Sequence, residues 1–145
     1  MEFPIAIPFA EMLGFELLQF EGGTAEIAVE LRADLCNSWM AAHGGVTMTL
    51  LDVVMVHAAR SPMPGVELDT RGAVTVEMKT SFLRTGSGRL LGRGKLLHRT
   101  KSLAFCEASV FDPDDLLVAH ATGTFKYLRS LTVAGQVVQR INASD

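Results

Sequence analysis

The sequence predicts an α+β fold in which a curved antiparallel sheet wraps around one long central helix. Three observations carry this prediction. Residues 44–60 form one stretch of helical length that is apolar on every side, which is typical of a buried helix. Segments with strand-like alternation of apolar and polar residues lie before it and after it. Because a sheet can bury only one face against a single helix, we expect the sheet to curve around that helix.

The elements expected before the central helix are a short helix, a hairpin and a loop. Residues 8–14 predict a helix that Gly14 closes. Two strand patterns flank Glu21-Gly22-Gly23, which is a hairpin signal. Residues 32–43 read as a loop, and the prolines in 61–65 stop the central helix. In the second hairpin strand we expect Ala25, Ile27, Val29 and Leu31 on a buried face, and Thr24, Glu26, Ala28 and Glu30 on a wet one.

The second half of the chain predicts three or four long antiparallel strands. The first covers residues 73–83, and a later one, residues 102–111, carries small side chains on its inner face. A turn at 113–115 leads into the last strand, residues 118–128. The expected faces are Val74, Val76, Met78, Thr80 and Phe82 for the first strand, and Ala104, Cys106, Ala108 and Val110 for the later one.

The strand over residues 89–99 is expected to have a basic side and an inner side. Glycines on the inner side would let a bulky element press closely against the sheet. The basic side carries Arg89, Arg93, Lys95 and Arg99, and the inner side Leu90, Gly92, Gly94, Leu96 and His98.

Length and composition bound the class of protein. A chain of 145 residues suits one domain over residues 1–145, with residues 129–145 a weakly patterned tail that we expect to fray. Cys36 and Cys106 have no CxxC spacing, so we expect neither a disulfide scaffold nor a zinc site, but a reduced cytoplasmic protein. The apolar stretch 46–59 is too short for a membrane span, and a net charge of −3 gives no nucleic-acid signal.

Basic residues are concentrated in one segment. Between Met78 and Cys106 lie seven of the thirteen basic residues and no acid. Two interpretations stay open: a local anionic ligand, or a solvated sheet face. The seven are Lys79, Arg84, Arg89, Arg93, Lys95, Arg99 and Lys101.

The central helix carries two features that suggest chemistry. Asp52 is an isolated carboxylate in an apolar run, and such a group needs a partner or a shifted pKa. It is either a structural acid or a nucleophile or base that activates water. Gly44 and Gly45 open the helix, either as a tight junction or as N–H groups that bind a developing oxyanion.

Helical geometry separates these two features. Gly44 and Asp52 are eight residues apart, which is roughly 12 Å along a helix. A nucleophile and an oxyanion donor must both lie about 3 Å from one reacting atom, so one chain cannot use both on the same substrate. An antiparallel pair of these helices could place Gly44 of one subunit opposite Asp52 of the other. We therefore expect a composite site in a homodimer, and unpaired sheet edges favour dimerisation as well.

Five residues with a defined spacing resemble the signature of a known family. Asn37 stands six positions before His43-Gly44-Gly45 begins, and Asp52 nine positions after His43. This signature resembles that of the hotdog-fold acyl-CoA thioesterases, in the PaaI-like subgroup, over roughly residues 10–128. The resemblance implies a hotdog fold and hydrolysis of an acyl-CoA thioester. It implies that Asp52 is the catalytic carboxylate, that the Gly44 N–H polarises the thioester carbonyl, and that Asn37 positions substrate or water. His43 belongs to the same signature and is counted with these catalytic residues, and its own expected role is to fix the loop before the helix.

The resemblance also implies a path for the substrate. Positions that match the acyl or coenzyme A path are Gly45, Thr75, Phe82 to Arg84 and His98 through Ser102, which include Arg99 and Lys101. Coenzyme A phosphates then become the ligand of the basic segment. Val56 departs from the small residue that many relatives carry four positions after the acid, which concerns the acyl preference. No metal or cofactor is implied, since coenzyme A is part of the substrate, and a dimer of dimers is the expected assembly.

Two other functions compete with hydrolysis. A non-catalytic acyl-CoA binder or regulator could use the same fold. A hotdog hydratase is suggested by Asp52 and His57, which have the Asp-x4-His spacing of that family. Five residues on a helix leave the two side chains roughly 140° apart, so this match is weak.

Overall fold

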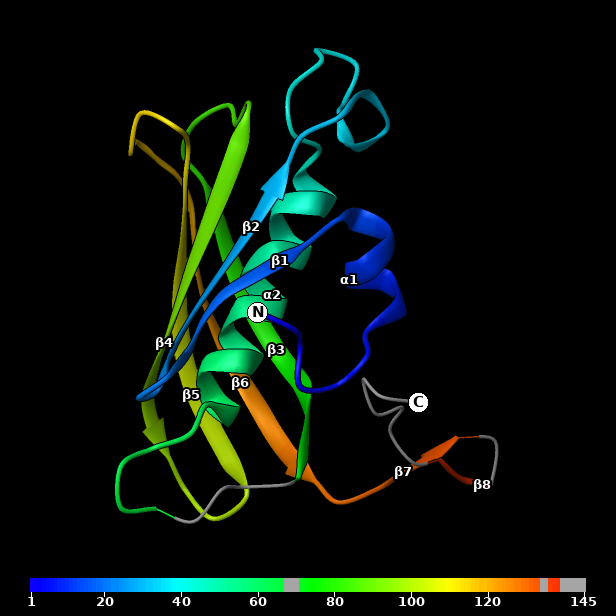
Figure 1. Cartoon of the computed structure of the whole chain (residues 1–145), viewed down its shortest axis with the longest axis vertical. Coiled ribbons are helices and arrows are strands. Elements are labelled where there is room, and N and C mark those ends of the chain that lie inside the picture. The colour runs from blue at the N-terminus through cyan, green and yellow to red at the C-terminus, as the bar shows by residue number, and fades with distance from the viewer. Residues whose placement is uncertain (67–70, 134–135, 139–145) are drawn as a thin grey trace.

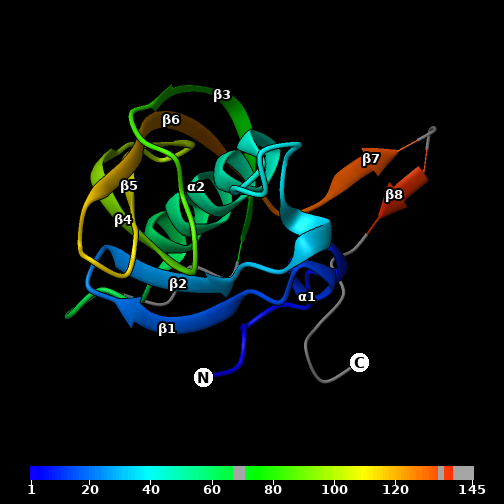
Figure 2. The ribbon, with the colours of Figure 1, turned by 90° about the horizontal axis from the view of Figure 1, so that it is seen from above.

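The computed structural model describes residues 1–66, 71–133 and 136–138. Its main feature is a six-stranded antiparallel sheet in the order β1-β2-β4-β5-β6-β3, curved around the helix α2 (Figures 1 and 2). The predicted α+β architecture is confirmed, and β1 and β3 are the sheet edges. The elements are α1 (Pro8–Leu13), β1 (Glu16–Glu21), β2 (Thr24–Glu30), η1 (Ala33–Leu35), α2 (Gly44–Arg60), β3 (Gly72–Phe82), β4 (Arg89–Arg99), β5 (Leu103–Phe111), β6 (Leu117–Leu128), β7 (Leu131–Val133) and β8 (Gln136–Val138).

The elements before α2 follow the prediction. Gly14 ends α1 with a φ of 79°. Gly22 and Gly23 both have positive φ, 64° and 77°, as a two-residue hairpin turn requires. The expectation for Ala28 is wrong, because it is fully buried on the outer face of the sheet. Its methyl group is small and pairs with the larger Leu91 of β4, so its neighbours cover it.

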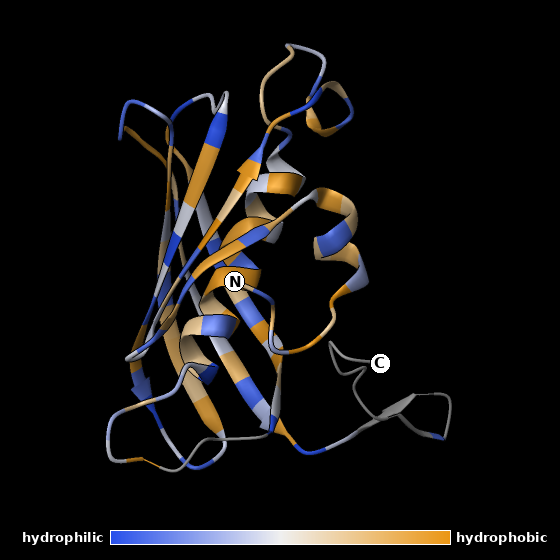
Figure 3. Ribbon diagram, viewed as in Figure 1, coloured by the Kyte–Doolittle hydropathy of each residue, from blue (hydrophilic) through white to orange (hydrophobic). Residues whose placement is uncertain are grey.

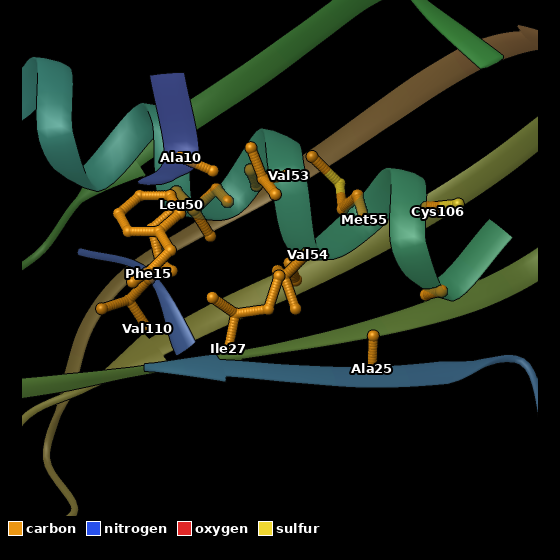
Figure 4. Close-up of a cluster of buried hydrophobic side chains, with 14 of the residues drawn as sticks. Ala10, Phe15, Ala25, Ile27, Leu50, Val53, Val54, Met55, Cys106 and Val110 are labelled. Carbon is orange, nitrogen blue, oxygen red and sulfur yellow. The ribbon is translucent and has the colours of Figure 1, made fainter. Parts of the chain in front are cut away.

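The inner face of β4 is where α2 approaches the sheet most closely. A β-carbon at Gly94 would lie 2.5 Å from the carbonyl oxygen of Val54, and one at Gly92 would lie 3.0 Å from Leu50. The expected role of these glycines is confirmed. Ile27 of β2 points toward Val54 in the same layer (Figure 4). The small inner residues predicted for β5 (Ala104, Cys106, Ala108 and Val110) are all buried.

A bulge in β3 overturns the predicted face of that strand. Pairing with β6 shifts register between Thr75 and Glu77, so Val76 is an extra residue and is 58% exposed. An inserted residue moves the following side chains to the opposite face. Thr75 therefore shares the helix-facing side with Met78, the side on which Thr80 and Phe82 also lie.

A second bulge, in β4, corrects the prediction for Arg99 and His98. The register with β5 shifts between Leu96 and His98. His98 consequently stacks on Phe105 outside the sheet, with ring centroids 6.2 Å apart. Arg99 pairs with the fully buried Ala104 and so lies on the inner side, not with the other basic residues.

The strands show alternating polar and apolar bands, whereas α2 is largely apolar (Figure 3). Beyond β6 the sequence predicted a fraying tail, but β7 and β8 pair as a short antiparallel ribbon. Residues 134–135 and 139–145 of that tail fall outside the described residues. No helix in the described part of the chain is long and apolar enough to cross a membrane.

Candidate active site

The helix α2 is not covered on all sides, contrary to the prediction. Ten of its seventeen residues are buried, and the remaining ones fall three or four positions apart, which places them on one side of the helix. This accessible stripe of α2 consists of Gly44, Gly45, Met48, Thr49, Asp52, Val56 and Arg60.

Asp52 lies in the middle of the stripe and has a specific partner. The Thr75 hydroxyl donates a hydrogen bond of 2.6 Å to its Oδ1 atom. Because the bulge at Val76 inserts one residue, Thr75 faces the helix on the same side of β3 as Met78 and Thr80. Partial burial raises the pKa of Asp52, and the hydrogen bond from Thr75 opposes that rise. The acid is therefore held at a defined place by one neutral donor, with no cation beside it among the causes of its shift.

The N-terminus of α2 presents one N–H group, that of Gly44, without an acceptor in the part of the chain that the structure describes. The ring of His43 accepts the Gly45 N–H at Nδ1, at 2.9 Å. The carbonyl of His43 accepts the N–H groups of Val46 and Thr47, at 3.0 and 3.2 Å. Within the described residues nothing accepts the Gly44 N–H. A β-carbon at Gly44 would lie 3.5 Å from the Phe82 ring, which is an ordinary van der Waals contact, so Phe82 lies directly beside this glycine.

An open hollow of about 380 Å³ lies beside this N–H group. It brings together four predicted site residues: Asn37, Gly44, Phe82 and Arg84. The Asn37 Oδ1 atom already accepts the N–H groups of Trp39 and Ala41, at 2.9 and 3.2 Å. The side-chain NH₂ group of Asn37 is thus the part that remains for a ligand. The two accepted hydrogen bonds also show that Asn37 shapes the loop. The remaining lining residues are Ala41, Ala42, Leu83, Thr85 and Gly86.

Asp52 does not line this hollow. Gly44 and Asp52 both belong to the unbroken helix α2, so the predicted separation of eight helical residues is confirmed. One chain therefore carries two half-sites: a hollow with an open N–H, and a carboxylate about 12 Å further along the helix.

The predicted coenzyme A residues divide between the two ends of α2. Arg84 lines the hollow at the N-terminal end. Arg99 lies over the Tyr127 ring, 4.9 Å from its centroid, and the Tyr127 hydroxyl donates to the carbonyl of Ala59 near the C-terminal end. Lys101 and Ser102 follow Arg99, and the Ser102 carbonyl accepts the Tyr127 N–H. In a single chain Arg84 cannot contact the same phosphate as these three.

The basic segment is not one anion-binding surface. Arg89 pairs with Glu16 at 2.7 Å and with Glu30 at 3.7 Å. Arg93 pairs with Glu26 at 3.1 Å. The acids come from β1 and β2, which the sheet places beside β4, so the interpretation as a single ligand site is wrong for these two arginines.

His57 takes no part in either half-site. Its side chain is 1% exposed, its Nδ1 donates to the carbonyl of Val53 at 2.7 Å, and its ring meets Phe3 and Phe20 edge-on. Its Nε2 has no partner within the described part of the chain, and burial lowers its pKa to about 4. The pairing of Asp52 with His57 that a hydratase would need is absent. No cluster of three or more potential metal ligands occurs among the described residues.

The profile of the thioesterase superfamily matches residues 41–119, a range that includes Gly44, Asp52 and Thr75. The chain belongs to the thioesterase superfamily. At the level of the family, this membership supports thioester hydrolysis as the reaction class. The chain is 27% identical over 135 residues to the medium/long-chain acyl-CoA thioesterase YigI of Salmonella typhimurium, covering 82% of the chain and 84% of that protein.

Solved structures show which fold the chain shares. The conserved protein PA5202 of Pseudomonas aeruginosa superposes with a TM-score of 0.77 at 31% identity, over 86% of this chain and 97% of that one. The Escherichia coli PaaI protein of the phenylacetic acid degradation operon superposes with a TM-score of 0.74 at 20% identity, over 83% of each chain. The fold of this superfamily member is therefore the hotdog fold.

Sequence reasoning missed two features of the site. Thr75 was expected along the substrate path, but the structure makes it the hydrogen-bond donor to Asp52. Met48 was indistinguishable from the core residues of an all-apolar helix. Its position four residues from both Gly44 and Asp52 was the signal that could have found it.

Proposed function

We propose that this protein is an acyl-CoA thioesterase of the PaaI-like subgroup, which hydrolyses an acyl-CoA to a free acid and coenzyme A. The observation that carries the proposal is the Asp52 carboxylate, held by Thr75 on the accessible stripe of an otherwise buried helix. Burying a carboxylate is costly unless it is paired with a cation, and a single hydroxyl offsets little of that cost. A catalytic role explains why the acid is there.

The chemistry follows from two groups. Asp52 takes a proton from water as the oxygen attacks the thioester carbon, and its raised pKa makes it a better base. The alternative is direct attack by Asp52, giving an anhydride that water then opens. In either case the carbonyl oxygen becomes negative and accepts a hydrogen bond from the Gly44 N–H. Collapse breaks the C–S bond, and the thiolate of coenzyme A leaves and takes up a proton.

We propose that each site is composite and lies in a homodimer, with Asp52 and Thr75 from one subunit and the hollow at Gly44 from the other. The separation along α2 supports this arrangement, since the two half-sites of one chain are about 12 Å apart. The edge strand β3 supports it too, because it has no neighbouring strand on one side among the described residues and carries the exposed side chains of Val76 and Phe82. We further propose that such dimers pair into tetramers. The protein is proposed to be cytoplasmic and to consist of one domain.

The phosphates of coenzyme A are proposed to bind to arginine and lysine side chains from both subunits. An antiparallel pair of helices brings the N-terminal end of one α2 near the C-terminal end of the other. Arg84 of one subunit and Arg99 and Lys101 of its partner then lie at the same end of the dimer. Arginine and lysine suit phosphates through charge-assisted hydrogen bonds. No further cofactor enters this scheme.

The test replaces Asp52 by asparagine, which keeps the size and removes the charge. Asp114→Asn, in the exposed turn before β6, is the matched control. With a panel of acyl-CoA esters and a thiol-detecting reagent, Asp52→Asn is expected to lose on the order of 10²–10⁴ in kcat, whereas Asp114→Asn keeps its activity. Undiminished turnover by Asp52→Asn would remove the acid from the chemistry.

The same assay separates hydrolysis from passive binding. A non-catalytic acyl-CoA binder would bind the esters in a calorimeter without releasing thiol, even as the wild-type protein. Turnover by the wild-type protein excludes that alternative.

A further inference from the structure

Met48 is the large apolar residue that α2 leaves exposed. It is 38% exposed, whereas Leu50 and Leu51 beside it are fully buried. It lies on the accessible stripe, four residues after Gly44 and four residues before Asp52.

Two-fold symmetry gives this position a special meaning. In a symmetric dimer, if Asp52 meets Gly44 of the partner subunit, then Gly44 meets Asp52 of the partner subunit. The residue midway between them must then lie opposite its own copy across the two-fold axis. Four residues on a helix advance about 6 Å and turn about 40° beyond one full turn, so Met48 bisects the pair both along and around the helix.

We infer that Met48 lies on the two-fold axis of the dimer, against Met48 of the partner subunit, and that this pair forms the wall that limits the length of the acyl chain in both active sites. The inference rests on the proposed function. It adds a residue that determines specificity and that neither reacts with nor orients the thioester.

The direction of the acyl chain follows from what lies on each side of Asp52. Toward the C-terminus the stripe leads through Val56 to Arg60, in the region where Arg71 and Arg99 flank Tyr127. This end suits the polar coenzyme A. Val56 then lies on the coenzyme A side of Asp52, not at the acyl end with which the resemblance associated it. Toward the N-terminus the stripe leads to Met48, about 6 Å away along the helix. The acyl chain therefore points toward the axis, where the two methionines separate it from the chain in the second site.

The first experiment asks whether position 48 meets its own copy. Met48→Cys is made in a Cys36→Ser background, since Cys106 is buried and its thiol pKa is raised to about 12. Met12→Cys, from the exposed methionine on α1, is the matched control. Facing Cα atoms of closely packed helices come within disulfide reach. Copper phenanthroline or a short bismaleimide should convert Met48→Cys to a covalent dimer on a denaturing gel, and Met12→Cys far less.

The second experiment measures chain-length preference. The ratio of kcat/KM for a long over a short acyl-CoA is determined for wild type, Met48→Ala, Met48→Phe and the control Met12→Ala. A change of one or more methylenes of space is worth about tenfold or more in such a ratio. We expect Met48→Ala to raise the ratio at least about tenfold, Met48→Phe to lower it, and Met12→Ala to leave it unchanged.

The outcomes separate this inference from the function on which it rests. A cross-linked dimer with shifted ratios supports it. A cross-linked dimer with unchanged ratios overturns the acyl wall and leaves the composite site standing. An active Met48→Cys protein that does not cross-link overturns the axis and the composite site together. Cross-linking of a wild-type-like fold without any acyl-CoA turnover would overturn the thioesterase proposal and the acyl wall while supporting the axis.

Discussion

The buried imidazole of His57 is expected to make the protein sensitive to acid. Its pKa falls from 6.5 to about 4, chiefly because burial disfavours the charged ring, and nearby Arg60 adds to this. The hydrogen bond to the Val53 carbonyl acts in the opposite direction. An imidazole with a depressed pKa stays neutral in the folded state while the unfolded state already binds a proton.

The size of the effect follows from these two pKa values. As pH falls below 6.5, the imidazole of His57 binds a proton in the unfolded chain but not in the folded chain. The free energy of unfolding therefore drops by about 1.4 kcal/mol per pH unit. The loss ends once the folded ring is itself protonated, near pH 4. By pH 4 the protein should have lost about 3 kcal/mol through this one residue, a large share of a typical stability.

Non-titrating replacements isolate this contribution. We expect His57→Leu and His57→Gln to be less sensitive to pH than wild type, whatever their offset at pH 7. Urea unfolding followed by far-UV circular dichroism between pH 7.5 and 4 measures the difference, and the contributions of other groups, including Asp52, cancel in it. Fluorescence of the single tryptophan is unsuitable, because Trp39 is 87% exposed in the folded state. A wild-type-minus-variant difference that stays flat from pH 7 to 4 would refute the reasoning.

Three further predictions concern packing, the acid and coenzyme A. Gly94→Ala should cost about 1–3 kcal/mol or more in thermal or urea unfolding, because its β-carbon would meet the backbone of Val54 at 2.5 Å. Thr75→Val should move the acid limb of the kcat/KM profile to higher pH, since the lost hydrogen bond no longer lowers the pKa of Asp52. Arg84→Ala should raise KM for acyl-CoA by roughly tenfold with little change in kcat, since a phosphate contact is made equally before and during reaction.

Each of these has an internal control. Gly92→Ala should cost less than Gly94→Ala, because its nearest contact is the movable side chain of Leu50 at 3.0 Å. Thr75→Ser keeps the hydroxyl and should keep the wild-type pH profile. Arg93→Ala, which loses an ion pair with Glu26 on the outer face, should leave KM unchanged. Equal effects of Arg84→Ala and Arg93→Ala on KM would contradict the proposed path of coenzyme A.

Local signals were sufficient for much of the fold. The central helix begins at Gly44 and ends at Arg60, as predicted, because an unbroken apolar run between a glycine pair and a proline-containing segment has few other solutions. The hairpin turn at Gly22 and Gly23 and the glycine contacts on β4 were equally readable, since each depends on a residue type that one backbone environment requires.

The change of face at the bulges in β3 and β4 could not be predicted. Alternation assumes that each residue pairs with one partner, and both strands contain a bulge that breaks this rule. Whether a bulge occurs depends on the strand alongside, which comes from a distant part of the sequence. For this reason Val76 and His98 were placed on the wrong faces.

By itself the sequence determined the spacing of the two candidate groups along α2, because eight residues between Gly44 and Asp52 give about 12 Å of helix whatever packs around them. The proposed second subunit, and the proposed midpoint at Met48, are both argued from that spacing. Only the tertiary structure decided which side chains contact one another. Thr75 reaches Asp52, Arg93 pairs with Glu26, and His57 is enclosed by Phe3, because strand register and chain crossing bring together residues whose own neighbours in sequence carry no sign of the contact.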